Sequence, residues 1–347
     1  MLQIELIILY CLKQLNNERT IYSIFHLLNG KKSSQTLQDA HLFSLKRFFG
    51  IYEPLTRESF DKITESMVEK NWIVTCGDQR YQLTPSGKTL LENNKLPNYI
   101  NGWDYQFTSL VWERLSLLVQ VASNFVFEEA KYIPIQKDKD VHLWLKSFLR
   151  DFNGQRKEMG NIVYSELIEC FKEAIGINPS LLVFRLTGYQ QIGLTPFQTA
   201  KKVNMDIHDY QIGFLNILHY LIQKIKQNPS QFRILVFLIR DVNVADDLTL
   251  SSRRTREFLN EGYPLEMIAK LRHLKLSTIE DHLVEFALNI NGFSIDAYVD
   301  KELQVKILGI SRQLATRQLK LIRENLKTAT YFQIRLVLAK SGDKKWN

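Results

Sequence analysis

The stretch Leu250-Ser-Ser-Arg-Arg-Thr-Arg-Glu-Phe-Leu-Asn-Glu-Gly-Tyr-Pro-Leu-Glu-Met-Ile-Ala-Lys-Leu-Arg-His-Leu-Lys-Leu-Ser-Thr-Ile-Glu-Asp-His-Leu283 decides the fold of the C-terminal part. Its pattern predicts two helices separated by Gly262 and Pro264, then a tight turn and a third helix. Ser277 is the predicted N-cap of the third helix, and Glu280 would complete a capping box. Three helices in this order are typical of a helix-turn-helix, which places its third helix against a nucleic-acid groove.

The third helix carries acidic residues where a DNA-reading helix would carry cations or amides. Projected at about 100° per residue with Ile279 inward, it places Asp281, Glu285 and Leu288 outward. Bases are read in the major groove mainly by Arg, Lys, Asn and Gln, whereas carboxylates repel phosphate. These three outward residues are therefore predicted to contact a partner protein.

Cations on the first two helices and on the turn are predicted to hold the DNA backbone without reading bases. Together with two polar residues at the start of the third helix, this set comprises Arg253, Arg254, Arg256, Lys270, Arg272, Lys275, Ser277 and Thr278.

The C-terminal region resembles the helicase-associated helix-turn-helix domain at the C-terminus of some bacterial RecQ-type helicases. In overall length and order of segments, the chain is similar to the YpbB family, the free-standing version of that domain. The resemblance is specific over about the last hundred residues and looser elsewhere. It implies DNA and a RecQ-type helicase on another chain as partners. The residues that carry it are Leu259, Gly262, Ile268-Ala269, Leu274, Ser277 to Leu283, 319–326 and 331–339.

Composition sets the broad class of the protein. The chain has 347 residues, 45% of them hydrophobic and 24% charged, which is typical of a soluble globular protein with room for two or three domains. The formal charge of +8 mildly favours an anionic partner, and a slightly basic protein with no such partner remains an alternative. Three scattered cysteines, no signal peptide and no apolar run long enough for a bilayer predict a cytoplasmic protein without membrane contact. With DNA as a partner, it is expected to be nucleoid-associated.

The N-terminal residues have the order of a winged helix. Helices up to Lys70 precede two short strands around Gly77-Asp78, and Thr84-Pro85 begins a closing helix. This part resembles the winged-helix domain of RecQ helicases. A presumptive recognition helix begins near Ser33, where cations, hydroxyls and free helix N–H groups can hold phosphate; alternatively, a serine only caps the helix and the lysines are solvated. The predicted DNA contacts are Lys31, Lys32, Ser33, Ser34 and Gln35, with Arg80 on the wing.

The tip of this wing argues against strand separation. A hairpin that splits a duplex needs a side chain that stacks on a base, worth about 1–3 kcal/mol per base. The tip here is Gly77-Asp78-Gln79, which has no aromatic residue.

The middle of the chain is predicted to be helical throughout, beginning with a long helix in 103–130. The segment 193–204, followed by a helix over 210–226, leaves open a further helix-turn-helix. Near the C-terminus, one helix over 311–327 is predicted to present a basic face to DNA, with an ordinary amphipathic surface helix as the alternative. That face comprises Arg317, Lys320, Arg323 and Lys327.

No recognisable catalytic chemistry appears in the sequence. Gly87-Lys88-Thr89 matches the second half of a P-loop, but its first glycine would fall at Gln82. Histidines and cysteines form no metal-binding spacing. We therefore expect no enzyme activity, no metal and no cofactor.

These observations predict a mainly α protein with a winged-helix domain at 1–96, a helical middle domain at 97–245 and a helicase-associated helix-turn-helix domain at 246–347. The favoured function is a non-catalytic accessory subunit of a RecQ-type helicase that binds the helicase and the DNA backbone in replication, recombination or repair. The alternative is a helix-turn-helix transcription regulator that binds an operator.

Overall fold

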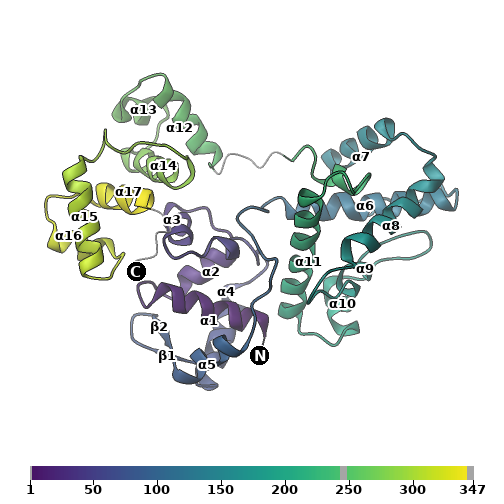
Figure 1. Cartoon of the computed structure of the whole chain (residues 1–347), viewed down its shortest axis with the longest axis horizontal. Coiled ribbons are helices and arrows are strands. Elements are labelled where there is room, and N and C mark those ends of the chain that lie inside the picture. Colours follow the sequence, from purple (N-terminus) through teal and green to yellow (C-terminus); the bar gives the residue numbers. More distant parts are fainter. Residues whose placement is uncertain (1, 243–247, 342–347) are drawn as a thin grey trace. The chain divides into compact units, whose positions relative to one another are not determined.

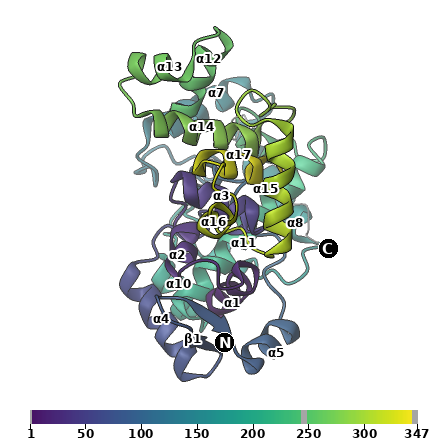
Figure 2. The same cartoon turned by 90° about the vertical axis from the view of Figure 1, so that its left-hand side faces the viewer.

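The computed structural model describes residues 2–242 and 248–341 and is mainly helical (Figures 1 and 2). Contacts divide the chain into two units, the first comprising Met1–Ile7 with Leu90–Asn243 and the second Ile8–Thr89 with Val244–Asn347. Most of the predicted N-terminal domain, residues 8–89, therefore lies in one unit with the C-terminal domain, whereas residues 1–7 and 90–96 belong to the other unit. The predicted boundary at 245 and 246 lies outside the described residues, and the three-domain division remains a prediction. Among the described residues, no helix is long and apolar enough to cross a membrane.

Hydroxyl caps begin two of the N-terminal helices. The Ser33 hydroxyl accepts a hydrogen bond from the Thr36 N–H at 3.3 Å, and Thr56 accepts from the Ser59 N–H at 3.2 Å. The elements of this part are α1 (Gln3–Leu15), α2 (Tyr22–Leu28), α3 (Ser34–Leu42), η1 (Lys46–Phe48), α4 (Arg57–Glu69), β1 (Ile73–Thr75), β2 (Tyr81–Leu83) and α5 (Pro85–Asn93).

The predicted hairpin and its closing helix are confirmed. β1 and β2 pair antiparallel, with Ile73 opposite Leu83. Thr84 Oγ1 then accepts from the Gly87 N–H at 3.1 Å, which caps the start of α5. A Cβ added at Gly87 would lie 2.1 Å from the Trp72 carbonyl oxygen, so glycine is needed for α5 to approach the chain before β1.

The C-terminal part contains the predicted helix-turn-helix. The first helix, α12 (Leu250–Asn260), ends at a turn in which Gly262 has a φ of +85°, and the tight turn after α13 (Leu265–Leu271) holds His273 at a φ of +52°. The elements are α12 (Leu250–Asn260), α13 (Leu265–Leu271), α14 (Leu276–Asn289), α15 (Lys301–Gln313), α16 (Leu319–Asn325) and α17 (Tyr331–Ser341).

The helices of the first unit pack around one long central helix, α11 (Ile207–Gln227). Residues 217–222 are all buried, so neighbours cover every side of this part of the helix. His219 lies there, and burial lowers its pKa to about 3. Around α11 are α6 (Thr108–Val126), α7 (Lys139–Asp151), η2 (Arg156–Glu158), α8 (Met159–Phe171), α9 (Ser180–Val183), α10 (Pro196–Lys202) and η3 (Leu235–Leu238), with α11 itself spanning Ile207–Gln227.

Helices α10 and α11 have the local form of a helix-turn-helix. Thr195 and Gln198 form a capping box at α10, and Asn204 takes a φ of +53° in the turn. However, α11 is the core helix of its unit, and the Asp209 carboxylate in its first turn accepts the Gln3 N–H at 2.6 Å. This segment therefore presents no free recognition helix.

A buried carboxylate holds the connection after α11. Glu166 on α8 accepts the Ile234 N–H at 2.9 Å and the Leu235 N–H at 2.8 Å. Arg114 on α6 donates to the Leu238 carbonyl at 2.9 Å and pairs with Asp241 at 2.6 Å. The Arg114 hydrogen bond lowers the pKa of Asp241.

Candidate nucleic-acid interface

The presumptive recognition helix α3 is covered within its own unit. It packs against α14 and α17, and every residue from Thr36 to Leu42 is buried (Figure 2). The expectation that α3 lies open at a DNA groove is therefore wrong. Ser33 caps the helix, and Ser34 accepts a hydrogen bond from Arg335, whereas Lys31, Lys32 and Gln35 remain exposed.

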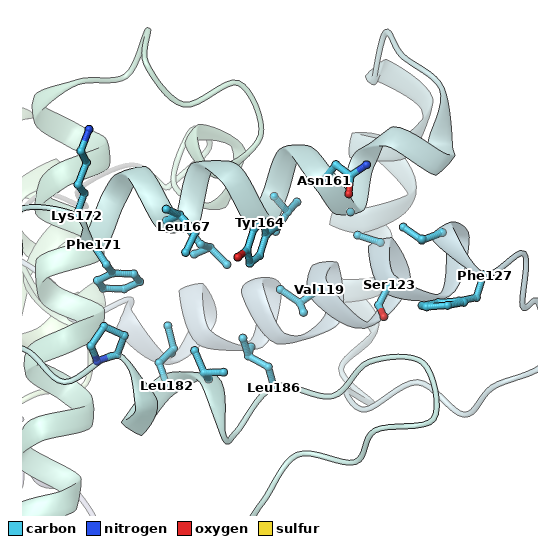
Figure 3. Close-up of a pocket in the computed structure, with 17 residues that line it drawn as sticks. Val119, Ser123, Phe127, Asn161, Tyr164, Leu167, Phe171, Lys172, Leu182 and Leu186 are labelled. Atoms are coloured by element: carbon cyan, nitrogen blue, oxygen red, sulfur yellow. The ribbon is translucent and has the colours of Figure 1, made fainter.

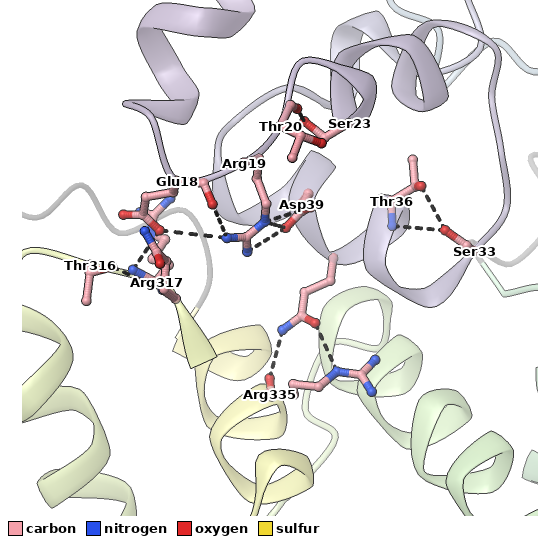
Figure 4. Close-up of polar contacts among 12 residues, drawn as sticks. Glu18, Arg19, Thr20, Ser23, Ser33, Thr36, Asp39, Thr316, Arg317 and Arg335 are labelled. Carbon is pink, nitrogen blue, oxygen red and sulfur yellow. Dashed lines mark hydrogen bonds and ion pairs between the residues drawn. The ribbon is translucent and has the colours of Figure 1, made fainter. Parts of the chain in front are cut away.

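Arg335 joins three helices of this unit. Its guanidinium, on α17, donates to Asp281 on α14 at 2.6 Å, to Gln38 on α3 at 3.2 Å and to the Ser34 hydroxyl. Gln38 returns a hydrogen bond to the Arg335 carbonyl at 3.2 Å (Figure 4). Planar guanidinium donors suit such a multiple contact. Asp281, a predicted partner-protein contact, is therefore engaged inside the chain.

A second polar contact links the N-terminal and C-terminal parts (Figure 4). The Glu18 carboxylate accepts the Arg317 N–H at 2.9 Å, and the Arg317 guanidinium lies 5.4 Å from the centre of the Phe43 ring. Beside it, the Arg19 guanidinium pairs with Asp39 at 2.9 Å. Burial raises the pKa of Glu18 and of Asp39, and the neighbouring arginines offset part of each rise.

Glu285 does not point outward as the helical projection predicted. It is 6% exposed and accepts hydrogen bonds from the Thr249 N–H, the Thr249 hydroxyl at 3.2 Å and the Ser252 hydroxyl. It therefore holds the start of α12 against α14. Leu288 is half-buried. The prediction that Glu285 contacts a partner protein is therefore wrong, because its side chain packs against α12 inside the chain.

Arg272 also has a structural role. Its guanidinium donates to the Ser251 carbonyl at 2.8 Å and to the Thr255 hydroxyl. The Thr255 hydroxyl lies 2.7 Å from His282 Nδ1, and burial lowers the pKa of His282 to about 4. Because Arg272 donates to the Thr255 hydroxyl, that hydroxyl can in turn donate its own hydrogen to Nδ1 of the neutral His282 ring. This chain of contacts fixes the turn between α13 and α14 on α12.

The capping prediction at α14 is wrong. The N-cap is Lys275, without a side-chain cap, and Ser277 lies in the first turn. The positive end of a 14-residue helix is therefore accompanied by an exposed lysine and an exposed hydroxyl. A helix start of this kind suits a phosphate oxygen.

Three exposed cations gather around this helix start. Lys270 and Lys275 flank the turn, and Arg254 directly precedes Thr255, whose hydroxyl accepts a hydrogen bond from Arg272 at the same turn. Arg253, Arg256 and Thr278 are half-buried. Arg254, Lys270 and Lys275 are named here the turn cations.

The predicted basic helix over 311–327 is interrupted. α15 ends at Gln313, Ala315 takes a φ of +46°, and α16 begins at Leu319. Arg317 lies in the turn between the two helices. The Arg323 guanidinium stacks on the Tyr331 ring, with its central carbon 4.4 Å from the ring centre. Lys320 and Lys327 are exposed. The four cations therefore do not share one helical face.

The wing is polar at its tip and anchored at its base. Gly77, Asp78 and Gln79 are exposed, while Arg80 is half-buried and its guanidinium lies 3.5 Å from the Asn17 carbonyl. In a winged helix, the recognition helix directly precedes the hairpin. Here that position is taken by α4, not by α3. Its exposed charges are mixed, comprising Arg57, Glu58, Lys62, Glu65 and Glu69.

The sequence interpretation missed Arg335, Gln38 and Asp39 as the contacts that close this unit. A signal for the first was present. Arg335 is the one charged residue in the apolar stretch Tyr331–Ala339, and a charge in a buried stripe requires a partner.

Comparison with known proteins agrees with this architecture. A family model described as a helix-turn-helix domain matches residues 251–338, and such a domain suggests DNA binding. The chain is similar to protein YpbB of Bacillus subtilis (strain 168), with 33% identity over 343 residues that cover 97% of each protein. No solved structure matches. Similarity of this extent, along nearly the whole length of both proteins, shows that the chain belongs to the YpbB family.

Proposed function

We propose that this protein is a non-catalytic accessory subunit of a RecQ-type DNA helicase, and that it supplies a grip on the DNA backbone. The observation that carries the DNA part is the position of α3 and α14, which pack on each other through Arg335. Gln38 on α3 and Asp281 on α14 are thereby engaged inside the chain and are not free to read bases. Among the exposed groups on the helix-turn-helix, the turn cations and the start of α14 are those that suit phosphate, although Glu257, Glu261 and Glu266 are exposed as well.

The helicase part of the proposal is supported by resemblance. The C-terminal domain is similar to the domain that RecQ-type helicases carry after their motor, and no motor motif appears in this sequence. The ATP-hydrolysing motor would therefore be supplied by a helicase on another chain. Such a subunit would act on the nucleoid, in replication, recombination or repair.

The DNA contact predicts a defined salt dependence. We expect the Arg254→Ala/Lys270→Ala/Lys275→Ala variant to lower the slope of log Kd against log salt by about 2–3, because each phosphate contact contributes about 0.9. Fluorescence anisotropy with labelled duplex and forked DNA measures this slope. The control variant Lys139→Ala/Lys146→Ala/Lys201→Ala removes three exposed lysines from the other unit. Equal slopes for both variants would contradict the assignment.

The helicase contact is tested by co-expression with a RecQ-type helicase that lacks its own C-terminal domain. We expect the two proteins to co-purify and the complex to unwind forked DNA faster than the truncated helicase alone. The triple variant of the turn cations should keep the complex but lose the gain in unwinding. Absence of both the complex and the gain would refute the helicase role. Protection of a defined site on genomic fragments would instead identify a transcription regulator.

A further inference from the structure

An apolar groove crosses the first unit, which does not contain the helix-turn-helix. It has a volume of about 650 Å³ and lies between α6, α8 and α9. Figure 3 shows Tyr164 and Leu167 of α8 on one side and Val119 and Leu182 on the other. Its floor is tight, because a Cβ added at Gly160 would lie 2.5 Å from Val126 Cγ2.

The rim of the groove is apolar and open. Phe127 is 60% exposed, Tyr164 67%, Ile168 56% and Val183 56%. At one end, Phe127 stacks on Tyr189 with ring centres 4.4 Å apart, which extends the apolar surface. Contiguous exposed apolar surface of this kind marks an interaction site. A ligand confined to the groove would leave these rim side chains in water, whereas a helix lying along it would cover them.

The length of the groove fits a short helix. Its wall α8 has 13 residues, which corresponds to about 20 Å at about 1.5 Å per residue. Recognition of a helix in a groove uses apolar side chains at positions i, i+3 or i+4, and i+7. Three to four turns of an amphipathic helix would therefore fill it.

The charges at the two ends have opposite signs. Lys172 is the one charged side chain among the residues that line the groove in the described part of the chain, and it lies at the Phe171 end (Figure 3). Its pairing with Glu169 is loose, at 3.8 Å between exposed groups. At the other end α6 terminates at Val126, with Phe127 as its C-cap, and its last carbonyl groups carry partial negative charge. The two carboxylates that follow are engaged within the chain, Glu128 by Lys157 and Glu129 by the Lys131 N–H, so the helix end supplies the negative charge here.

We propose that this groove binds an amphipathic helix of a partner protein, oriented parallel to α8. The positive N-terminal end of the bound helix lies at Phe127, and an acidic residue in its last turn meets Lys172. The site does not depend on DNA binding by the other unit.

A displayed library tests the proposal on the full-length protein. The probe is a set of 16-residue helical peptides with apolar residues at i, i+4, i+7 and i+11 and with all residues allowed in the last turn. We expect enrichment of peptides with Asp or Glu in that turn. Ile168→Glu, which places a charge on the rim, should weaken their binding more than tenfold by anisotropy.

The controls separate the groove from the rest of the unit. Leu143→Glu changes an equally exposed apolar residue, 62% exposed on α7, and should leave binding unchanged. Lys172→Glu should shift the selected last-turn residues to Lys or Arg, whereas Lys146→Glu should not. Circular dichroism verifies that each variant folds.

Four results would overturn the proposal or its orientation. Absence of enrichment, or enrichment that Ile168→Glu leaves intact, removes the helix site. A charge preference unmoved by Lys172→Glu overturns the assigned direction. Binding of a fluorescent fatty acid to the groove, without any enriched peptide, assigns it to an acyl chain instead.

Discussion

Glu285→Ala is expected to lower the free energy of unfolding of the unit that contains it by about 2–4 kcal/mol. The carboxylate is buried and accepts hydrogen bonds from the Thr249 N–H and from the hydroxyls of Thr249 and Ser252. Alanine would leave the Thr249 N–H and the Ser252 hydroxyl without this acceptor, whereas the Thr249 hydroxyl could still donate to Ser252 Oγ at 2.9 Å, and it would leave a cavity behind. Urea denaturation followed by circular dichroism measures the loss.

A matched control is Glu257→Ala, which removes an exposed carboxylate from α12. We expect its effect to stay within about 0.5 kcal/mol. If Glu285→Ala destabilised the protein no more than this control, Glu285 would not anchor α12.

Arg335→Ala is expected to cost about 2–3 kcal/mol, because it removes one side chain that bonds to both α3 and α14. Asp281 would lose its guanidinium partner in a half-buried site. Faster amide hydrogen exchange in α3 and α14 should accompany the loss. Urea denaturation and hydrogen exchange monitored by mass spectrometry provide the two measurements.

A control substitution on the same helix, α17, tests whether the effect is specific to Arg335. Lys340→Ala removes an exposed cation from the last turn of α17 and should leave exchange in α3 unchanged. A double-mutant cycle with Asp281→Ala should give a coupling of about 1 kcal/mol. Zero coupling, with unchanged exchange in α3, would mean that Arg335 does not hold these helices together.

Much of the fold could be predicted because its signals are local. Hydroxyl caps at Ser33 and Thr56 begin α3 and α4, and Gly262 ends α12. The order of helices and hairpin also follows from short-range patterns. The mainly helical fold and the C-terminal helix-turn-helix are confirmed.

The orientation of α14 could not be predicted from its own sequence. A projection with Ile279 inward assumes one buried side, but α14 packs against α12, α13, α3 and α17. Residues 282–287 are consequently all buried. The position of Glu285 depends on partners far away in the chain, which periodicity does not reveal.

The break between α15 and α16 escaped prediction for another reason. The residues at the break include Ala315 and Thr316, which do not prevent a helix. Ser311 donates to the Thr316 carbonyl at 2.7 Å, and the Arg317 N–H bonds to Glu18. Contacts with the N-terminal part thus outweigh local helix propensity, and they turn a predicted basic face into separate cations.

The unit formed by Ile8–Thr89 with Val244–Asn347 has a consequence for synthesis on the ribosome. Its first half emerges long before its second half, with the other unit made in between. Until the last hundred residues leave the exit tunnel, the apolar side of α3 has no cover, and a nascent chain in that state is exposed to aggregation or to chaperones.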